Sequence, residues 1–126
     1  PHVSGLFNEA DKDFGDIKII DCSPENWLWL IDYAEYVFTD SFHGAVFSTI
    51  FEKKVCVLKR TGKTDINNRM IDFMKMIEQT DKIISSNQLN SLNNMTWNYC
   101  RTRKILDEKI EFSKEYIKNA LMFEEM

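Results

Sequence analysis

The sequence has little cysteine and no long apolar run. Its three cysteines, Cys22, Cys56 and Cys100, lie far apart and form no C-x-x-C pair. A scattered, odd set of this kind favours buried thiols in a reducing compartment over a disulfide framework or a zinc site. No apolar stretch approaches the roughly 20 residues that a membrane span requires. We therefore expect a cytoplasmic protein with no transmembrane segment, and peripheral attachment to the inner face of the membrane is left open.

Basic residues are not in excess either. The chain has 16 Lys and Arg against 20 Asp and Glu, a net charge of −4. Nucleic-acid binding needs a basic surface to neutralise phosphates, so this class of function is disfavoured. A local basic pocket for a small anion stays compatible with the composition.

Several chemical signatures are missing as well. The sequence contains no P-loop, no G-x-G-x-x-G, no nucleophile elbow and no constellation of metal ligands. We therefore predict no metal and no resident cofactor. The first residues lack an initiator Met and a signal peptide, so we expect a piece of a longer protein.

What is present fits one globular domain. The 126 residues are 44% hydrophobic and 29% charged, the balance of a soluble folded chain. A chain of this length matches a single domain over residues 1–126. Such a domain buries about two-thirds of its unfolded surface, enough for a core without disulfide or metal crosslinks.

Short β-branched runs alternate with segments of helical periodicity. Four strands are predicted, at Ile17–Asp21, Tyr36–Thr39, Lys54–Leu58 and Lys82–Ile84. Helices are predicted to begin at Ser23 and at about His43, and a third is predicted over about 67–78. A closing helix is predicted from about Thr96 to Phe123, with about 99–123 as its main part. Residues 60–66 and the Asn/Ser-rich stretch 85–94 are predicted as loops, the second anchored by Leu89 and Leu92.

The periodicity also predicts which side chains face inward. We expect Val46, Phe47, Ile50 and Phe51 on one side of the helix near His43, and Met70, Phe73, Met74 and Ile77 inward on the next helix. Leu106, Ile110, Ile117 and Leu121 form the predicted inner stripe of the closing helix. This alternation of strands and helices predicts an α/β domain with a parallel, Rossmann-like sheet and flanking helices.

Ligands of open α/β sheets bind beyond the carboxyl ends of the strands. Two joints of this kind occur, Asp21–Pro24 and Thr39–Ala45, and the second is chemically richer. Ser41 can cap the following helix, whose first N–H groups suit a phosphate or carboxylate. Gly44 leaves room for a ligand near the backbone. His43 can transfer a proton, and Asp40 can orient it.

The same residues also suit a purely structural role. Ser41 is a good N-cap, worth about 1 kcal/mol, and Asp40 beside a helix start gains from the helix dipole. His43 can equally be a half-buried residue with a satisfied hydrogen bond. Spacing alone leaves both interpretations open.

The run from Ala34 to Lys54 resembles the signature of polysaccharide pyruvyl transferases. In that family a strand ending in T-D-S-F-H-G leads into a helix of the form x-x-F-S-x-x-F, then a polar turn and a strand. Weaker similarities are Ser23–Leu28 to the family's S-P-E-x-F-L helix start and Asn68-Arg69-Met70 to its N-x-R segment. The last helix resembles the family's S-x-x-Y-L-x-x-A-L ending. Lys82 stands near where the family usually places an Arg, so that position is not transferred.

The resemblance implies a fold, a reaction and partners. Family members are much longer bacterial enzymes with two glycosyltransferase-B-like lobes, so this chain is expected to be the C-terminal, donor-binding part, without its N-terminal lobe. The implied reaction moves the enolpyruvyl group of phosphoenolpyruvate, a co-substrate, onto a sugar or a lipid-linked oligosaccharide in exopolysaccharide or capsule biosynthesis. His43 and Asp40 are the expected catalytic residues, and Ser41, Gly44 and Arg69 the expected ligand-binding residues. Lys59 and Arg60 are secondary anion candidates.

Two other functions fit the sequence. One is the sugar-nucleotide-binding lobe of a glycosyltransferase with the same fold, and the other is a non-catalytic module that binds a partner. If the enzyme interpretation is right, the isolated chain is expected to be inactive, because half of the cleft would be missing.

Overall fold

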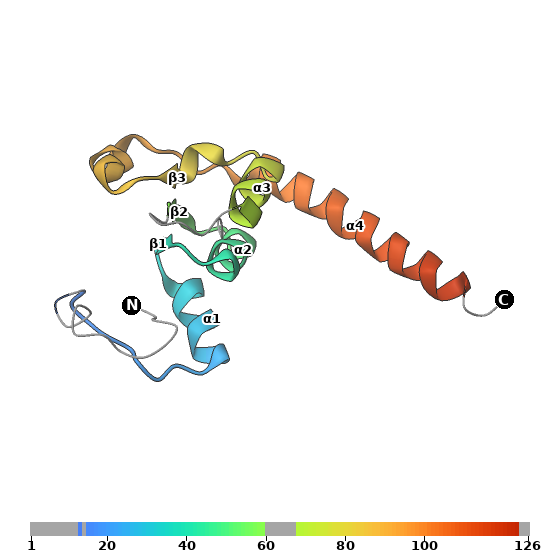
Figure 1. The fold of residues 1–126 in the computed structure, drawn as a ribbon, viewed down its shortest axis with the longest axis horizontal. Coiled ribbons are helices and arrows are strands. Elements are labelled where there is room, and N and C mark those ends of the chain that lie inside the picture. The colour runs from blue at the N-terminus through green and yellow to red at the C-terminus, as the bar shows by residue number, and fades with distance from the viewer. Residues whose placement is uncertain (1–12, 14, 60–67, 124–126) are drawn as a thin grey trace.

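Helices and strands alternate along the chain. In the computed structural model, residues 13, 15–59 and 68–123 are described. The elements are α1 (Pro24–Tyr33), β1 (Tyr36–Thr39), α2 (Phe42–Ile50), β2 (Lys54–Leu58), α3 (Asn68–Met76), the 3-10 helix η2 (Thr80–Lys82), β3 (Ile83–Ile84), the 3-10 helix η3 (Ser86–Asn94) and α4 (Tyr99–Phe123) (Figure 1). The predicted α/β class is confirmed.

The three strands form one parallel sheet in the order β1-β2-β3. Val37 of β1 is in register with Val55, and Val57 of β2 with Ile83. Parallel strands place their carboxyl ends on the same edge of a sheet. Thr39, at the end of β1, and Leu58, at the end of β2, therefore share the edge at which ligands of such folds bind.

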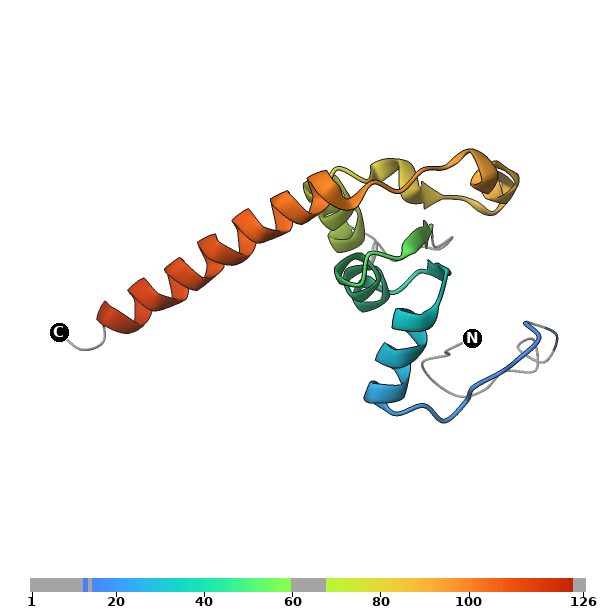
Figure 2. The same ribbon diagram turned by 180° about the vertical axis from the view of Figure 1, so that it is seen from behind.

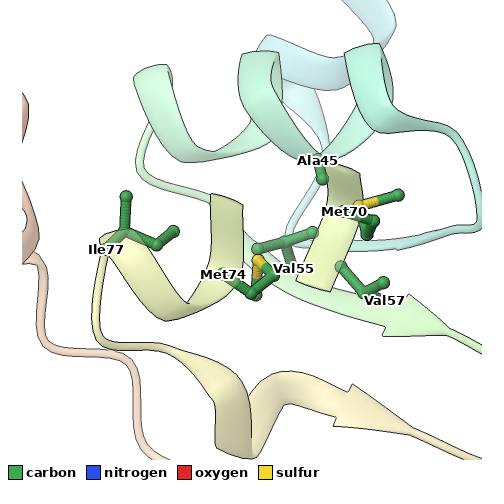
Figure 3. Close-up of a cluster of buried hydrophobic side chains, with 6 residues drawn as sticks. All are labelled: Ala45, Val55, Val57, Met70, Met74 and Ile77. Carbon is green, nitrogen blue, oxygen red and sulfur yellow. The ribbon is translucent and has the colours of Figure 1, made fainter. Parts of the chain in front are cut away.

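A cluster of buried apolar side chains joins α2 and α3 to the middle strand. Its members are Ala45 from α2, Val55 and Val57 from β2, Met70 and Met74 from α3, and Ile77 just after α3 (Figure 3). Both helices therefore cover the same face of the sheet. The predicted inward positions of α3 are confirmed, with Phe73 partly buried against this cluster.

The predicted strand at Ile17–Asp21 is wrong. These residues form bends and irregular chain, and the Ile17 and Ile20 side chains are 77% and 70% exposed. A β-branched run becomes a strand only where a neighbour offers backbone partners and apolar cover. Within the described residues this segment has neither, so the sheet begins at Tyr36.

The buried face of α2 also differs from the prediction. Gly44, Ala45, Ser48 and Thr49 are buried, whereas Ile50 is 54% exposed. Small side chains let the helix axis come close to the strands, so they occupy the contact with the sheet. Phe42 packs against the core cluster from the start of α2, whereas Phe47 packs edge to face with Trp27 of α1, with ring centroids 5.7 Å apart.

The closing helix α4 is attached to the body only at its start. Thr102 and Ile105 are buried and Leu106 packs against the core cluster. Beyond them the helix runs away from the sheet (Figures 1 and 2). The predicted inner stripe therefore fails after Leu106, since Ile110, Ile117 and Leu121 are exposed.

Two smaller features complete the description. Residues 86–94, predicted as a loop, form η3, which begins with a capping box between Ser85 and Gln88. Its expected anchor Leu89 is exposed. Among the described helices, none combines the length and the apolar character that crossing a bilayer requires.

Candidate functional site

The turn between β1 and α2 is held by three local hydrogen bonds. The Ser41 N–H donates to Thr39 Oγ1 at 3.0 Å, and Ser41 Oγ accepts from the Gly44 N–H at 3.3 Å. The Ala45 N–H donates to the Ser41 carbonyl oxygen at 3.0 Å, the first hydrogen bond of the helix. Ser41 is thus the N-cap of α2. By helix geometry, the N–H groups of Phe42 and His43 precede this bond and have no acceptor within the helix.

Gly44 is required for packing at this turn. A Cβ atom at this position would lie 2.5 Å from Thr39 Oγ1 and 3.2 Å from Thr39 Cβ. The residue is buried, and its N–H is already bonded to Ser41. Close packing against Thr39 therefore explains why position 44 is a glycine, which the sequence did not reveal. Its role in ligand binding stays a prediction.

The N-termini of α1 and α2, the two helix starts at which the sequence suggested a ligand site, differ in charge. The first turn of α1 contains Glu25, whose pKa is lowered by a hydrogen bond from its own backbone N–H and by a second from Ser23. The first turn of α2 contains no acidic residue. The positive end of the α1 dipole is thus met by a carboxylate in its own first turn, whereas the carboxylate next to α2 in sequence, Asp40, stands before the N-cap.

The Phe42 ring lies beside two functional side chains, those of Arg69 and His43. The Arg69 Cζ lies 4.8 Å from the centroid of the Phe42 ring, and the His43 ring centroid lies 5.8 Å from it. Phe42 is held from α3 by the edge of the Phe73 ring, at 5.9 Å. The side chains of His43 and Arg69 are both exposed. The structure therefore brings Arg69, distant in sequence, to the turn that carries His43.

The other predicted positions are more simply described. Asp40 is exposed and lies between the end of β1 and the N-cap of α2. Lys59 follows the carboxyl end of β2, where its N–H donates to the Ile84 carbonyl oxygen at 3.2 Å. Arg60 lies outside the described residues.

Sequence reasoning missed the supporting residues Thr39 and Phe42. Thr39 had a usable signal, since a hydroxyl two residues before an N-cap can bond that backbone. No local pattern indicated the role of Phe42, because its ring lies between His43 of α2 and Arg69 of α3, which are far apart in sequence.

This arrangement can bind a small anion. Two helix N–H groups, the positive end of a helix dipole, the Ser41 hydroxyl and a guanidinium all favour phosphate or carboxylate oxygens. An exposed imidazole adds a group that can hold or deliver a proton near neutral pH. Over residues 13, 15–59 and 68–123, no group of three or more His, Cys, Asp and Glu side chains could hold a metal ion.

A cavity of about 510 Å³ lies at the opposite edge of the sheet, beside Tyr36 and Lys54 at the amino ends of β1 and β2. Its lining includes neither the residues of the β1–α2 turn nor Arg69. The candidate site is therefore defined by the chemistry of the turn and not by an enclosed space.

Comparison with known proteins supports one family. A family model described as polysaccharide pyruvyl transferase matches residues 3–61, which include α1, β1, α2 and β2. No curated protein and no solved structure gives a significant match. The matched stretch contains the whole β1–α2 turn. Over residues 3–61 this chain is thus similar to polysaccharide pyruvyl transferases, which is consistent with the family that its motifs resemble.

Proposed function

We propose that this chain is the donor-binding part of a polysaccharide pyruvyl transferase and that the β1–α2 turn binds phosphoenolpyruvate. The observation that carries the proposal is the position of Arg69 and His43 beside the same Phe42 ring, at the N-terminus of α2. The family match supports a transferase of this kind. The acceptor in the proposal is a sugar of a surface polysaccharide, free or lipid-linked.

The proposed reaction converts an enol phosphate to a ketal and releases the phosphate. The methylene carbon of phosphoenolpyruvate gains a proton and becomes a methyl group, leaving a cationic centre at the adjacent carbon. One sugar hydroxyl forms a C–O bond to that centre. A second hydroxyl of the same sugar then replaces the phosphate. One hydroxyl proton replaces the proton that was added to the methylene carbon, and the other leaves with the phosphate. No external oxidant or reductant is needed.

Each residue has a distinct proposed role. The guanidinium of Arg69 pairs with two oxygens of the carboxylate or phosphate, for which its planar shape is suited. The N–H groups of Phe42 and His43 and the Ser41 hydroxyl bind the remaining phosphate oxygens. His43 delivers the proton to the methylene carbon or holds the leaving phosphate. Asp40 orients the imidazole or accepts a proton from the sugar.

The direct test follows the label of the donor. The protein with its complete natural sequence is incubated with a polysaccharide acceptor and either phosphoenolpyruvate labelled in the pyruvyl carbons or a sugar nucleotide labelled in the sugar. We expect label in the acceptor only from phosphoenolpyruvate. Transfer from the sugar nucleotide instead would support the glycosyltransferase alternative.

A binding experiment on the 126-residue chain tests the site itself. Titration calorimetry with phosphoenolpyruvate should give at least about tenfold weaker binding for Arg69→Ala, since a charge-assisted hydrogen bond contributes about 1.5–3 kcal/mol. Lys75→Ala is the matched control, because it removes an exposed positive charge from the same helix at its other end. Equal weakening by both variants would mean that only net charge matters.

Activity separates binding from chemistry. His43→Ala in the complete protein should lower kcat by about 10²–10⁴-fold, the range of general acid catalysis, with the helix content unchanged. Turnover near that of the wild type would remove His43 from the mechanism.

A further inference from the structure

The cavity at the amino ends of β1 and β2 is distinct from the site above. It has a volume of about 510 Å³, within the range of small-molecule pockets. Its lining includes aromatic rings and a few polar groups: Tyr36, Trp97, Tyr99, Glu52, Lys54 and Asn93. Along β1 it is separated from the β1–α2 turn by roughly 10 Å, the length of a four-residue strand.

Two of these rings are fixed to the backbone of the sheet. The indole Nε1–H of Trp97 donates to the Val55 carbonyl oxygen at 3.0 Å, and the Tyr99 hydroxyl donates to the Lys53 carbonyl oxygen. Burial raises the pKa of Tyr99, so its hydroxyl remains a donor at neutral pH. The pocket wall is thus formed before any ligand arrives, which lowers the entropic cost of binding.

The charges at this pocket are already balanced. Lys54 Nζ lies 2.9 Å from Glu35 Oε1, and Glu52 pairs with Arg103. Neither a strongly anionic nor a strongly cationic ligand would gain a free counter-charge here.

Two of the three rings, Tyr36 and Trp97, already lie beside a lysine ammonium group. Lys54 Nζ lies 4.7 Å from the centroid of the Tyr36 ring, and Lys82 Nζ lies 5.2 Å from that of Trp97. A ligand ammonium would approach rings that already hold positive charges, which is unfavourable. The pocket therefore suits a neutral ligand with both apolar and hydrogen-bonding surface.

We propose that this pocket binds a neutral sugar unit. A pyranose ring presents C–H faces that pack against Trp97 or Tyr99, and hydroxyls at its edge that can donate to the Glu52 carboxylate and accept from Lys54 and Asn93. The proposal goes beyond the pyruvyl transfer described above, because the pocket lies at the opposite edge of the sheet. It gives the chain a carbohydrate site that is separate from the proposed phosphoenolpyruvate site.

The test is an NMR titration of the 126-residue chain with cellobiose and with lactose, two neutral disaccharides. Choline and inorganic phosphate serve as the charged probes. We expect saturable shifts of the Trp97 indole N–H and of backbone amides of η3 with at least one disaccharide. We expect no comparable shift with choline or phosphate at these signals.

Paired variants locate the binding. Asn93→Ala should weaken the disaccharide affinity about fivefold, the factor that corresponds to the loss of one net hydrogen bond. Asn94→Ala, an exposed neighbour in η3 that does not line the cavity, should leave the affinity unchanged. Trp97→Phe should also weaken it and tests the ring itself.

Three results would overturn the proposal. They are no saturable shift with either disaccharide, a stronger response of the same signals to choline or phosphate, or equal affinities for Asn93→Ala and the wild type. None of them bears on donor binding at the β1–α2 turn, so failure here and failure of the proposed function are separate outcomes.

Discussion

Replacing Gly44 by alanine tests why the turn between β1 and α2 has its sequence. The new Cβ would lie 2.5 Å from Thr39 Oγ1, closer than such atoms approach, and 3.3 Å from Thr39 Cγ2, a tight contact. Thr39 would have to move, and its hydroxyl accepts the Ser41 N–H. The substitution therefore strains both the helix–strand contact and the hydrogen bond that orients the N-cap.

The magnitude follows from three opposing effects. Overpacking in a well-filled site costs about 1–3 kcal/mol, and weakening one hydrogen bond about 0.5–1.5 kcal/mol. Alanine in place of glycine in a helix gains about 1 kcal/mol. The net expectation is a loss of about 2 kcal/mol in the free energy of unfolding. In a domain of this size that loss lowers Tm by several degrees.

Urea unfolding followed by circular dichroism measures this loss. A double-mutant cycle with Thr39→Ala isolates the contact: once the hydroxyl is absent, Gly44→Ala should cost at least about 1 kcal/mol less than in the wild type. If Gly44→Ala were as stable as the wild type but bound phosphoenolpyruvate poorly, the packing explanation would be refuted. Gly44 would then serve the approach of the ligand to the backbone.

Substitutions at four other residues test other parts of the structure. Ser41→Ala and Ser23→Ala should each lower the free energy of unfolding, measured with urea, by about 1 kcal/mol, because each removes an N-cap. Only Ser41→Ala should also weaken phosphoenolpyruvate binding. Equal effects of the two variants on binding would contradict the proposed site. Thr102→Val should cost about 1–3 kcal/mol, because the buried Thr102 hydroxyl accepts one hydrogen bond and donates another; Thr102→Ser, which keeps the hydroxyl, is the control. Glu78→Gln should destabilise the protein at neutral pH and lose this effect in acid, since a hydrogen bond from Arg101 lowers the pKa of Glu78 in the folded state below its ordinary value. The stabilisation by the ionised carboxylate is present above the unfolded pKa and is lost as the pH falls through the folded one, so a pH-independent difference would argue against it.

The sequence predicted most of the elements that carry the candidate site. Tyr36–Thr39, Lys54–Leu58 and the helix start at Ser23 have strong local signals, and the structure forms all three. Local signals suffice here because strand propensity and capping chemistry agree with the tertiary contacts. Only the family resemblance suggested that Arg69 belongs to the site. No local sequence pattern indicates that a residue of α3 lies beside the ring of a residue of α2.

The failures have a common physical cause. Ile17–Asp21 has the composition of a strand, but pairing depends on a neighbour that composition does not reveal. The stripe of α4 has the period of a buried face, yet Ile110 and Ile117 lie past the end of the core. Periodicity tells which side chains share a face and not whether something covers it.

The hydrogen bonds that Trp97 and Tyr99 make to the carbonyl groups of Val55 in β2 and of Lys53 just before it set a lower limit on the length of chain that can fold. The family match ends at residue 61, but the strand within it is secured by side chains 42 and 46 positions further along. Met70, Met74 and Ile77, which fill the core above the same strand, also lie beyond the match. A shortened protein that stops at residue 61 would retain every residue of the β1–α2 turn and still lack the means to hold it in shape.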